Sequence, residues 1–269
     1  MFEKRGLEIF PKNKNGQVTI FIIVGIIIVV LSVLVYTFYP EIQSNLGIQE
    51  STPQSYIQSC VEDKLRETVD LISDQGGKLI PELYSRYNGI NIEYLCYTTE
   101  YYLPCIIQQP ALVQNIENEI RAELHQTALD CFDSLEASYV GKGYSVEMKA
   151  GNEIARLTPN RIELIYNNTF TITKGDDVQR YDSFVANLDN NLYELALITN
   201  SIIQWESTYG DADPEMYMVY YPNIKVERIL RDSGDKIYIL TDRDNGNKFQ
   251  FAVRSQVWPG GFVKPESTS

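Results

Sequence analysis

The feature that most constrains this chain is an apolar run near its start, from Val18 to Tyr39. The run holds 22 residues and no charged side chain. A helix of that length rises about 33 Å, enough to cross a hydrocarbon core of about 30 Å. In lipid only a helix satisfies every backbone polar group of a single segment, and this run is apolar on all faces, unlike a helix at the surface of a soluble core. We therefore predict a transmembrane helix over residues 18–39 that contacts the lipid bilayer.

The flanking charges predict the orientation of this helix. Four basic residues precede it: Lys4, Arg5, Lys12 and Lys14. After it, no Lys or Arg occurs before Lys64. Positive charge stays in the cytoplasm, so the N-terminus is expected inside the cell and the rest of the chain outside. No second apolar run of comparable length follows, and no small-x-small cleavage site ends this one, so we expect a single-pass protein that signal peptidase does not cut.

The start of the run carries a family resemblance. The stretch "KNGQVTIF", Lys14 to Phe21, resembles the archaeal class III signal sequence, the type IV pilin-like leader, in which a Gly and Gln-x-Ser/Thr open a long apolar helix. That resemblance implies cleavage between Gly16 and Gln17 and self-assembly into a filament. Asn15 and Phe21 depart from the pattern, so an uncleaved signal anchor is favoured and the filament subunit is the alternative. The same opening is similar to uncharacterised single-pass surface proteins of archaea, which implies a membrane location and an outward-facing domain, but no activity.

The charge of the chain excludes one class of partner. The net charge is −13, and the first 39 residues contribute four basic against two acidic side chains, so the remainder carries −15. A surface this acidic repels nucleic acid and anionic headgroups. We therefore expect no nucleic-acid partner.

The cysteine count predicts two disulfides. All four cysteines lie beyond the apolar run, and an even number outside the cell is typical of paired cysteines. "CYTTEYYLPC" reads as two short strands around a turn, which brings Cys96 opposite Cys105. Cys60 and Cys131 fall on the apolar stripes of two predicted helices. The predicted pairs are Cys60–Cys131 and Cys96–Cys105, and with one histidine in the chain no zinc site is expected.

The hydrophobic periodicity predicts an α+β fold: an N-terminal transmembrane helix, then an ectodomain of amphipathic helices and antiparallel β-sheet. Apolar residues recur at helical spacing after Pro53, over 111–138 and from Leu192 to Trp205, where Trp205 is expected on the buried face. Alternating segments after Gly141, separated by Gly-Asn, Pro-Asn and Asn-Asn turns, predict a meander, and three strands close the chain. The predicted organisation has six parts: a cytoplasmic basic segment 1–17, the transmembrane helix 18–39, a hinge 40–55, a disulfide-braced helical region 56–140, an α+β region 141–255 and a disordered tail 256–269.

The sequence contains few candidates for chemistry. His125 is the only histidine, and its place beside the stripe of a helix indicates a surface residue. No G-x-S-x-G, P-loop or G-x-G-x-x-G occurs. "DRDNGN", from Asp242, is interpreted as a hairpin turn rather than a calcium loop, and "GDADPE", from Gly210, as a solvated loop. We therefore expect no enzyme, cofactor or metal, although a pair of carboxylates in an ectoenzyme stays a second alternative.

Two features favour contacts outside the cell. Tyrosines cluster in "EYLCYTTEYYLP" and "MYMVYYP", and exposed tyrosines beside carboxylates suit an extracellular protein or glycan. Asn167 opens an N-x-T sequon, which makes it a candidate for glycosylation. The leading prediction is a membrane-anchored surface protein with a structural or binding role.

Overall fold

The computed structural model describes residues 23–30, 52–255 and 257. Residues 23–30 are helical, and within these described stretches no helix is both long and apolar enough to cross a membrane. The chain divides into two units at Ser51 and Thr52. The predicted cleavage site at Gly16–Gln17, the ends of the 18–39 run and the 256–269 tail (Val257 excepted) lie outside the described residues.

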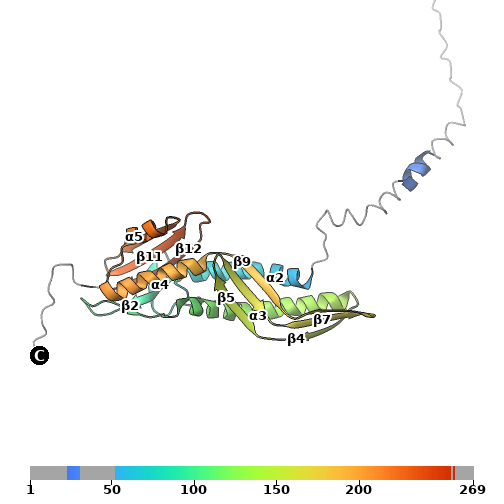
Figure 1. Cartoon of the computed structure of the whole chain (residues 1–269), viewed down its shortest axis with the longest axis horizontal. Helices are drawn as coiled ribbons and strands as arrows, with labels where there is room; N and C mark the ends of the chain where they lie inside the picture. The colour runs from blue at the N-terminus through green and yellow to red at the C-terminus, as the bar shows by residue number, and fades with distance from the viewer. Residues whose placement is uncertain (1–22, 31–51, 256, 258–269) are drawn as a thin grey trace, which may run out of the picture. The chain divides into compact units, whose positions relative to one another are not determined.

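Two long helices pack side by side in the second unit (Figure 1). They are α2, Pro53–Asp74, and α3, Leu112–Gly141. Thr52 caps α2 with its side-chain oxygen and Pro53 occupies the first turn. The helix therefore begins at Pro53, within the segment assigned to the hinge. Gly76 and Gly77, both at positive φ, follow its end.

Both predicted disulfides are present. Cys60–Cys131 joins α2 to α3 with a Cα–Cα distance of 6.0 Å, and Cys96–Cys105 closes the loop between two strands at 5.3 Å. Lys64 of α2 also contacts Glu123 of α3 at 2.9 Å. Residues 60 and 131, then 64 and 123, approach in opposite chain order, so the two helices are antiparallel.

The largest sheet draws strands from both halves of the unit. Its order is β1-β2-β12-β11-β10, with β3 beside β2. The bounds are β1 Tyr84–Tyr87, β2 Ile90–Tyr97, β3 Ile106–Ile107, β10 Ile224–Leu230, β11 Asp235–Asp242 and β12 Lys248–Arg254. β2 and β12 pair in parallel and the other neighbours are antiparallel. Because this sheet spans both sides of Gly141, the sequence-based boundary there does not separate two structural units.

The predicted meander has three long strands, each interrupted in the middle. β4 Ser145–Lys149 and β5 Glu153–Thr158 form the first, β6 Arg161–Tyr166 and β7 Thr169–Lys174 the second, and β8 Asp177–Tyr181 and β9 Phe184–Asp189 the third. The pairing is β5-β6-β9 on one side of the interruption and β4-β7-β8 on the other. Pro159-Asn160 is a turn as predicted, but the Gly-Asn and Asn-Asn pairs are the interruptions, where the chain continues in the same direction.

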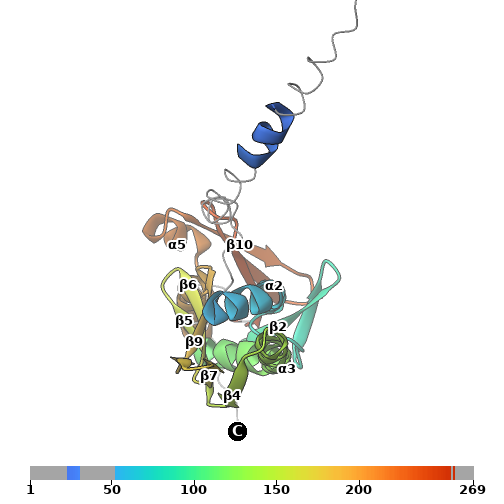
Figure 2. The ribbon, with the colours of Figure 1, turned by 90° about the vertical axis from the view of Figure 1, so that its right-hand side faces the viewer.

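The meander covers one side of the helix pair. Figure 2 shows β5, β6 and β9 beside α2 and α3. Phe132 of α3 packs edge-on against Tyr166 and Phe184, with ring centroids 5.7 and 5.1 Å away. This packing places one face of α3 against the meander, and the opposite face of the helix is exposed.

Two more helices complete the unit. α4, Leu192–Tyr209, contacts strands of both the large sheet and the meander. α5, Pro214–Tyr220, was not predicted from the sequence: Asp213 caps it and Pro214 begins it, so part of "GDADPE" starts a helix rather than a loop. β1 was likewise not predicted.

Candidate functional site

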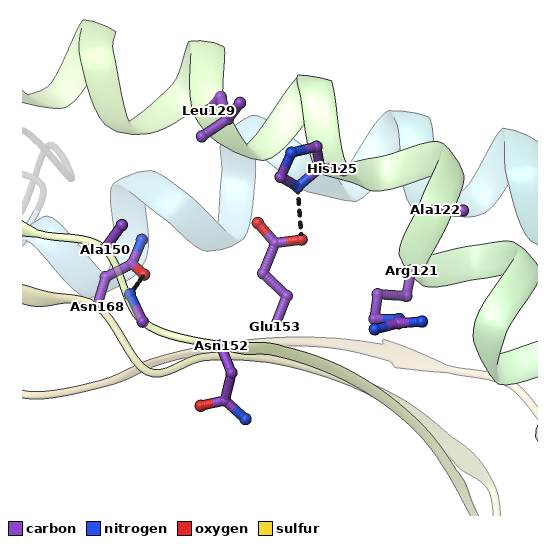
Figure 3. A pocket seen from close by; sticks show the side chains of 9 residues that line it. Arg121, Ala122, His125, Leu129, Ala150, Asn152, Glu153 and Asn168 are labelled. Atoms are coloured by element: carbon purple, nitrogen blue, oxygen red, sulfur yellow. Dashed lines mark hydrogen bonds and ion pairs between the residues drawn. The ribbon is translucent and has the colours of Figure 1, made fainter.

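A pocket of about 380 Å³ lies beside His125, between α3 and the edge of the meander (Figure 3). The exposed face of α3 supplies one wall and the interruption between β4 and β5 supplies the other. The lining residues are Arg121, Ala122, His125, Leu129, Ala150, Gly151, Asn152, Glu153 and Asn168.

Gly151 explains why the strand is interrupted here. A Cβ at this position would lie 1.9 Å from the carbonyl oxygen of Asn167, so only glycine permits this approach. The Gly151 N–H donates to Oδ1 of Asn168 at 2.8 Å, and the Asn167 N–H donates to the carbonyl of Asn152 at 3.0 Å. Asn168 is the polar member of an otherwise apolar row of inward-facing residues that continues from β6 into β7.

His125 pairs with Glu153 across the pocket. Its Nδ1 lies 3.0 Å from Oε2 of Glu153, with the histidine side chain 59% exposed and the glutamate 18% exposed. A carboxylate in this position orients the imidazole through the hydrogen bond to Nδ1. None of the side chains that line this pocket is a serine, threonine or cysteine, so the pair lacks an adjacent hydroxyl or thiol to activate.

A second candidate is the exposed surface of α4 and α5, which we call the α4–α5 surface. Trp205 is 50% exposed, contrary to the prediction that it is buried. Trp205 lies on a stripe with Leu197, Ser201 and Tyr209, four residues apart, that faces away from the core. α5 contacts this stripe at Ser201, whose Oγ lies 3.0 Å from the Tyr217 hydroxyl. The apolar side chains exposed on this surface are Leu197, Trp205, Tyr209, Met216, Val219, Tyr220 and Tyr221.

The residue that replaces Trp205 in the core is charged. Glu206 is fully buried, and both of its oxygens accept from Nζ of Lys236, at 2.8 and 3.0 Å. The hydroxyl of Tyr238 also donates to this carboxylate. Burial raises the pKa of Glu206 above its usual range, and the ammonium of Lys236 offsets only part of that rise. A glutamate at the i+4 position from Ile202, on the apolar face of a predicted helix, was the sequence signal for this cluster.

The acidic segments serve the fold. Asp211 of "GDADPE" lies 2.6 Å from Arg228 and 3.1 Å from Lys236, so it is an ion-pair partner although its side chain is 59% exposed. "DRDNGN" forms the turn between β11 and β12, as predicted, with Gly246 at positive φ. Within the described residues, no group of three or more His, Cys, Asp or Glu side chains could hold a metal ion.

The tyrosine clusters divide between core and surface. Tyr94 and Tyr217 are buried, while Tyr101, Tyr102, Tyr220 and Tyr221 are exposed. Asn167 is exposed at the interruption between β6 and β7, and its side chain donates to Oδ1 of Asn152 at 2.7 Å. The sequon therefore lies at the surface.

Comparison with known proteins identifies no related protein. No protein-family model, no curated protein and no solved structure matches this chain. Its function must be inferred from the geometry above.

Proposed function

We propose that this chain is a membrane-anchored extracytoplasmic protein with a binding role and no catalysis, held to the bilayer by residues 18–39. The observation that carries the proposal is the state of the cysteines: all four are paired, in two disulfides. Structural disulfides persist in oxidising compartments and are rare in the cytoplasm. The basic segment before the apolar run supports the same orientation.

The α4–α5 surface supports the binding role. Single exposed apolar residues are ordinary, but this surface gathers one tryptophan and three tyrosines on two neighbouring helices. Trp205 and Tyr209 pack against each other with ring centroids 4.8 Å apart. Aromatic side chains of this kind are enriched where proteins bind partners. By contrast, His125 is exposed and no serine, threonine or cysteine is among the residues that line its pocket, which argues against an ectoenzyme there.

Surface labelling tests the orientation. Intact cells that express the full chain are treated with a membrane-impermeant amine reagent, and the labelled lysines are identified by mass spectrometry. We expect label on Lys149, whose side chain is 73% exposed, and none on Lys4, Lys12 or Lys14. Labelling after lysis serves as the control, because it should reach both groups. Label confined to the N-terminal lysines of intact cells would refute the proposed orientation.

The second candidate function is a pilin-like filament subunit, which the "GQVT" opening of the apolar run favours. The mass of the mature N-terminus separates the two. A chain that begins at Gln17 indicates processing and assembly, while a chain that retains Lys12 and Lys14 indicates a permanent anchor.

A further inference from the structure

A pocket of about 430 Å³ opens on the α4–α5 surface, between the start of α4 and the end of α5. Its apolar wall includes Leu197, Tyr220 and Tyr221, and its polar wall includes Asn160, Glu194 and Asn223. The lining residues come from segments that are far apart in sequence: the turn at Asn160, the start of α4, residues 220–224 and Asp242. The fold therefore assembles this pocket, and no single motif specifies it.

The aromatic wall is rigidly mounted and open to solvent. Tyr220 is 72% exposed and Tyr221 is 47% exposed. The backbone around them is held on both sides, because the Tyr221 N–H donates to the Tyr217 carbonyl at 2.8 Å and the Ile224 N–H donates to the Tyr221 carbonyl at 2.9 Å. Tyr217 in turn anchors α5 to Ser201 of α4. Ring faces presented in this way are available to an apolar face of a ligand.

The polar wall contains an acceptor without a donor. One oxygen of Glu194 accepts from the Asn160 N–H at 3.0 Å. The other, Oε2, is buried and has no hydrogen-bond partner among the described residues. A buried carboxylate oxygen in that condition is costly, and because Glu194 lines the pocket, a rotation of its side chain would present this oxygen to a donor from a ligand.

The charges of the pocket restrict the ligand. No lysine or arginine lines it, so phosphates and carboxylates have no partner. The carboxylate of Asp242 is already hydrogen-bonded to the side-chain amides of Asn191 and Asn245 and to the backbone N–H of Asp244. Glu194 therefore supplies a charged acceptor with spare capacity in this lining. A ligand with neutral donors fits this arrangement better than a cation, since the amides of Asn160 and Asn223 offer donors as well as acceptors.

We propose that this pocket binds a neutral sugar. A sugar ring combines an apolar C–H face, which packs on the tyrosine rings, with hydroxyls that donate to Glu194 and exchange hydrogen bonds with the amides. The volume lies in the range of small-ligand sites. This inference rests on the proposed binding role and gives it a ligand class.

The test uses the full chain in vesicles free of glycolipid, titrated by calorimetry with four neutral disaccharides: cellobiose, maltose, lactose and mannobiose. We expect at least one of them to bind with a Kd of about 1 mM or tighter. Tyr220→Ala and Tyr221→Ala should each weaken that binding at least about fivefold, because each removes a ring face. Glu194→Gln should weaken it about tenfold, because it replaces a charged acceptor with an amide.

Val219→Ala is the matched control. Val219 is 77% exposed on α5 and does not line the pocket, so its removal should leave binding unchanged. Thermal unfolding of each variant shows whether the fold is retained. The proposal is overturned if none of the disaccharides binds, if the tyrosine variants bind as well as the parent, or if tetramethylammonium binds in their place. Failure here leaves the surface-labelling result standing, so the ligand class and the location of the protein are tested separately.

Discussion

The side-chain amide of Gln58 forms two hydrogen bonds with the backbone of Asn187. It donates to the Asn187 carbonyl at 2.9 Å and accepts from the Asn187 N–H at 2.8 Å. Gln54, one turn earlier on α2, repeats the arrangement with Val185, at 2.6 and 3.4 Å. Four residues of helix rise about 6.0 Å and two residues of strand about 6.8 Å, so the amides match the spacing of the strand. α2 thus covers the open edge of β9 as a neighbouring strand would, which protects this edge from pairing with another chain.

Replacing Gln58 tests the importance of that edge contact. Gln58→Leu keeps the side-chain volume but leaves the N–H and carbonyl of Asn187 without these partners. We expect a loss of about 1–3 kcal/mol in the free energy of unfolding, measured by urea denaturation. Gln126→Leu is the control, since Gln126 is exposed on α3 and bonds only to Asp130, four residues away. Equal effects of the two substitutions would show that the edge contact contributes nothing specific.

The two disulfides should differ in their contribution to stability. Cys60–Cys131 spans 71 residues and Cys96–Cys105 spans 9. In the chain-entropy model a longer loop restrains the unfolded chain more, which predicts losses of about 4 and about 2.5 kcal/mol on removal of each bridge. The double variants Cys60→Ala/Cys131→Ala and Cys96→Ala/Cys105→Ala allow the comparison by thermal unfolding. A larger loss from the short loop would contradict the entropic explanation.

Gly151→Ala should destabilise the interruption in the meander. The added methyl group would meet the Asn167 carbonyl at 1.9 Å, and a backbone atom cannot move aside as a flexible side chain can. We expect a loss of about 1–3 kcal/mol and faster hydrogen exchange at the Gly151 and Asn167 amides. Gly141→Ala is a suitable comparison, because nothing lies within 4 Å of a Cβ there and alanine favours the helix. Unchanged stability of the Gly151 variant would mean that the strands can separate at no cost.

The buried pair of Glu206 and Lys236 should be strongly coupled. Lys236→Met leaves the carboxylate buried without its cation, at an expected loss of about 3–5 kcal/mol. The double variant Glu206→Leu/Lys236→Met should recover much of that loss, since no unpaired charge remains. Lys225→Met, which removes one partner of an exposed pair with Glu227, should change stability by less than about 1 kcal/mol. If the stability loss of the double variant equalled the sum of the losses of the two single variants, the coupling would be disproved.

The same cluster predicts a pH dependence. Because burial raises the pKa of Glu206, the folded chain holds this proton more tightly than the unfolded chain does. The contribution of this group to stability is therefore greatest below the ordinary carboxyl pKa, and it falls as the pH rises through the window up to the pKa in the folded state. Glu206→Gln should flatten the unfolding free energy across that window. If the unfolding free energy changed with pH equally in the parent and the variant, groups other than Glu206 would cause the pH dependence.

Asn167 should accept a glycan in a host that modifies N-x-T sequons. The residue is exposed, and its side chain donates to the exposed Asn152. We expect the peptide that contains Asn167 to gain the mass of a glycan. The same peptide from the Asn167→Gln variant should show no such gain. If the peptide stayed unmodified after passage through the secretory pathway of such a host, the strand interruption would be inaccessible to the glycosylating enzyme.

Much of this fold could be predicted from local patterns. The apolar stripes predicted α2, α3 and α4, and "DRDNGN" predicted the turn between the last two strands. These signals act over a few residues, because helix caps and tight turns depend on neighbouring backbone groups. The cysteine pairing was also accessible, since two cysteines lay on helix stripes and two flanked one turn.

Other features depended on contacts between distant segments. Trp205 and Glu206 are neighbours in the sequence, and a hydrophobicity pattern assigns the tryptophan to the core. In the structure Trp205 is exposed and Glu206 is buried. Lys236 and Tyr238, 30 and 32 residues away from Glu206, supply the partners that a buried carboxylate requires. Similarly, Gly151-Asn152 and Asn167-Asn168 resemble turns in isolation, and they become interruptions because each pair lies opposite the other.

The sequence by itself therefore determined most elements of this protein and the identity of its bridges, since these follow from composition and short-range spacing. It also predicted the direction of the apolar N-terminal run. Only the tertiary structure decided which side of α4 faces solvent and brought Tyr220, Tyr221 and Glu194 into one pocket. The physical reason is that burial is a property of the whole packed chain: a side chain lies inside only where distant residues satisfy its volume and its charge.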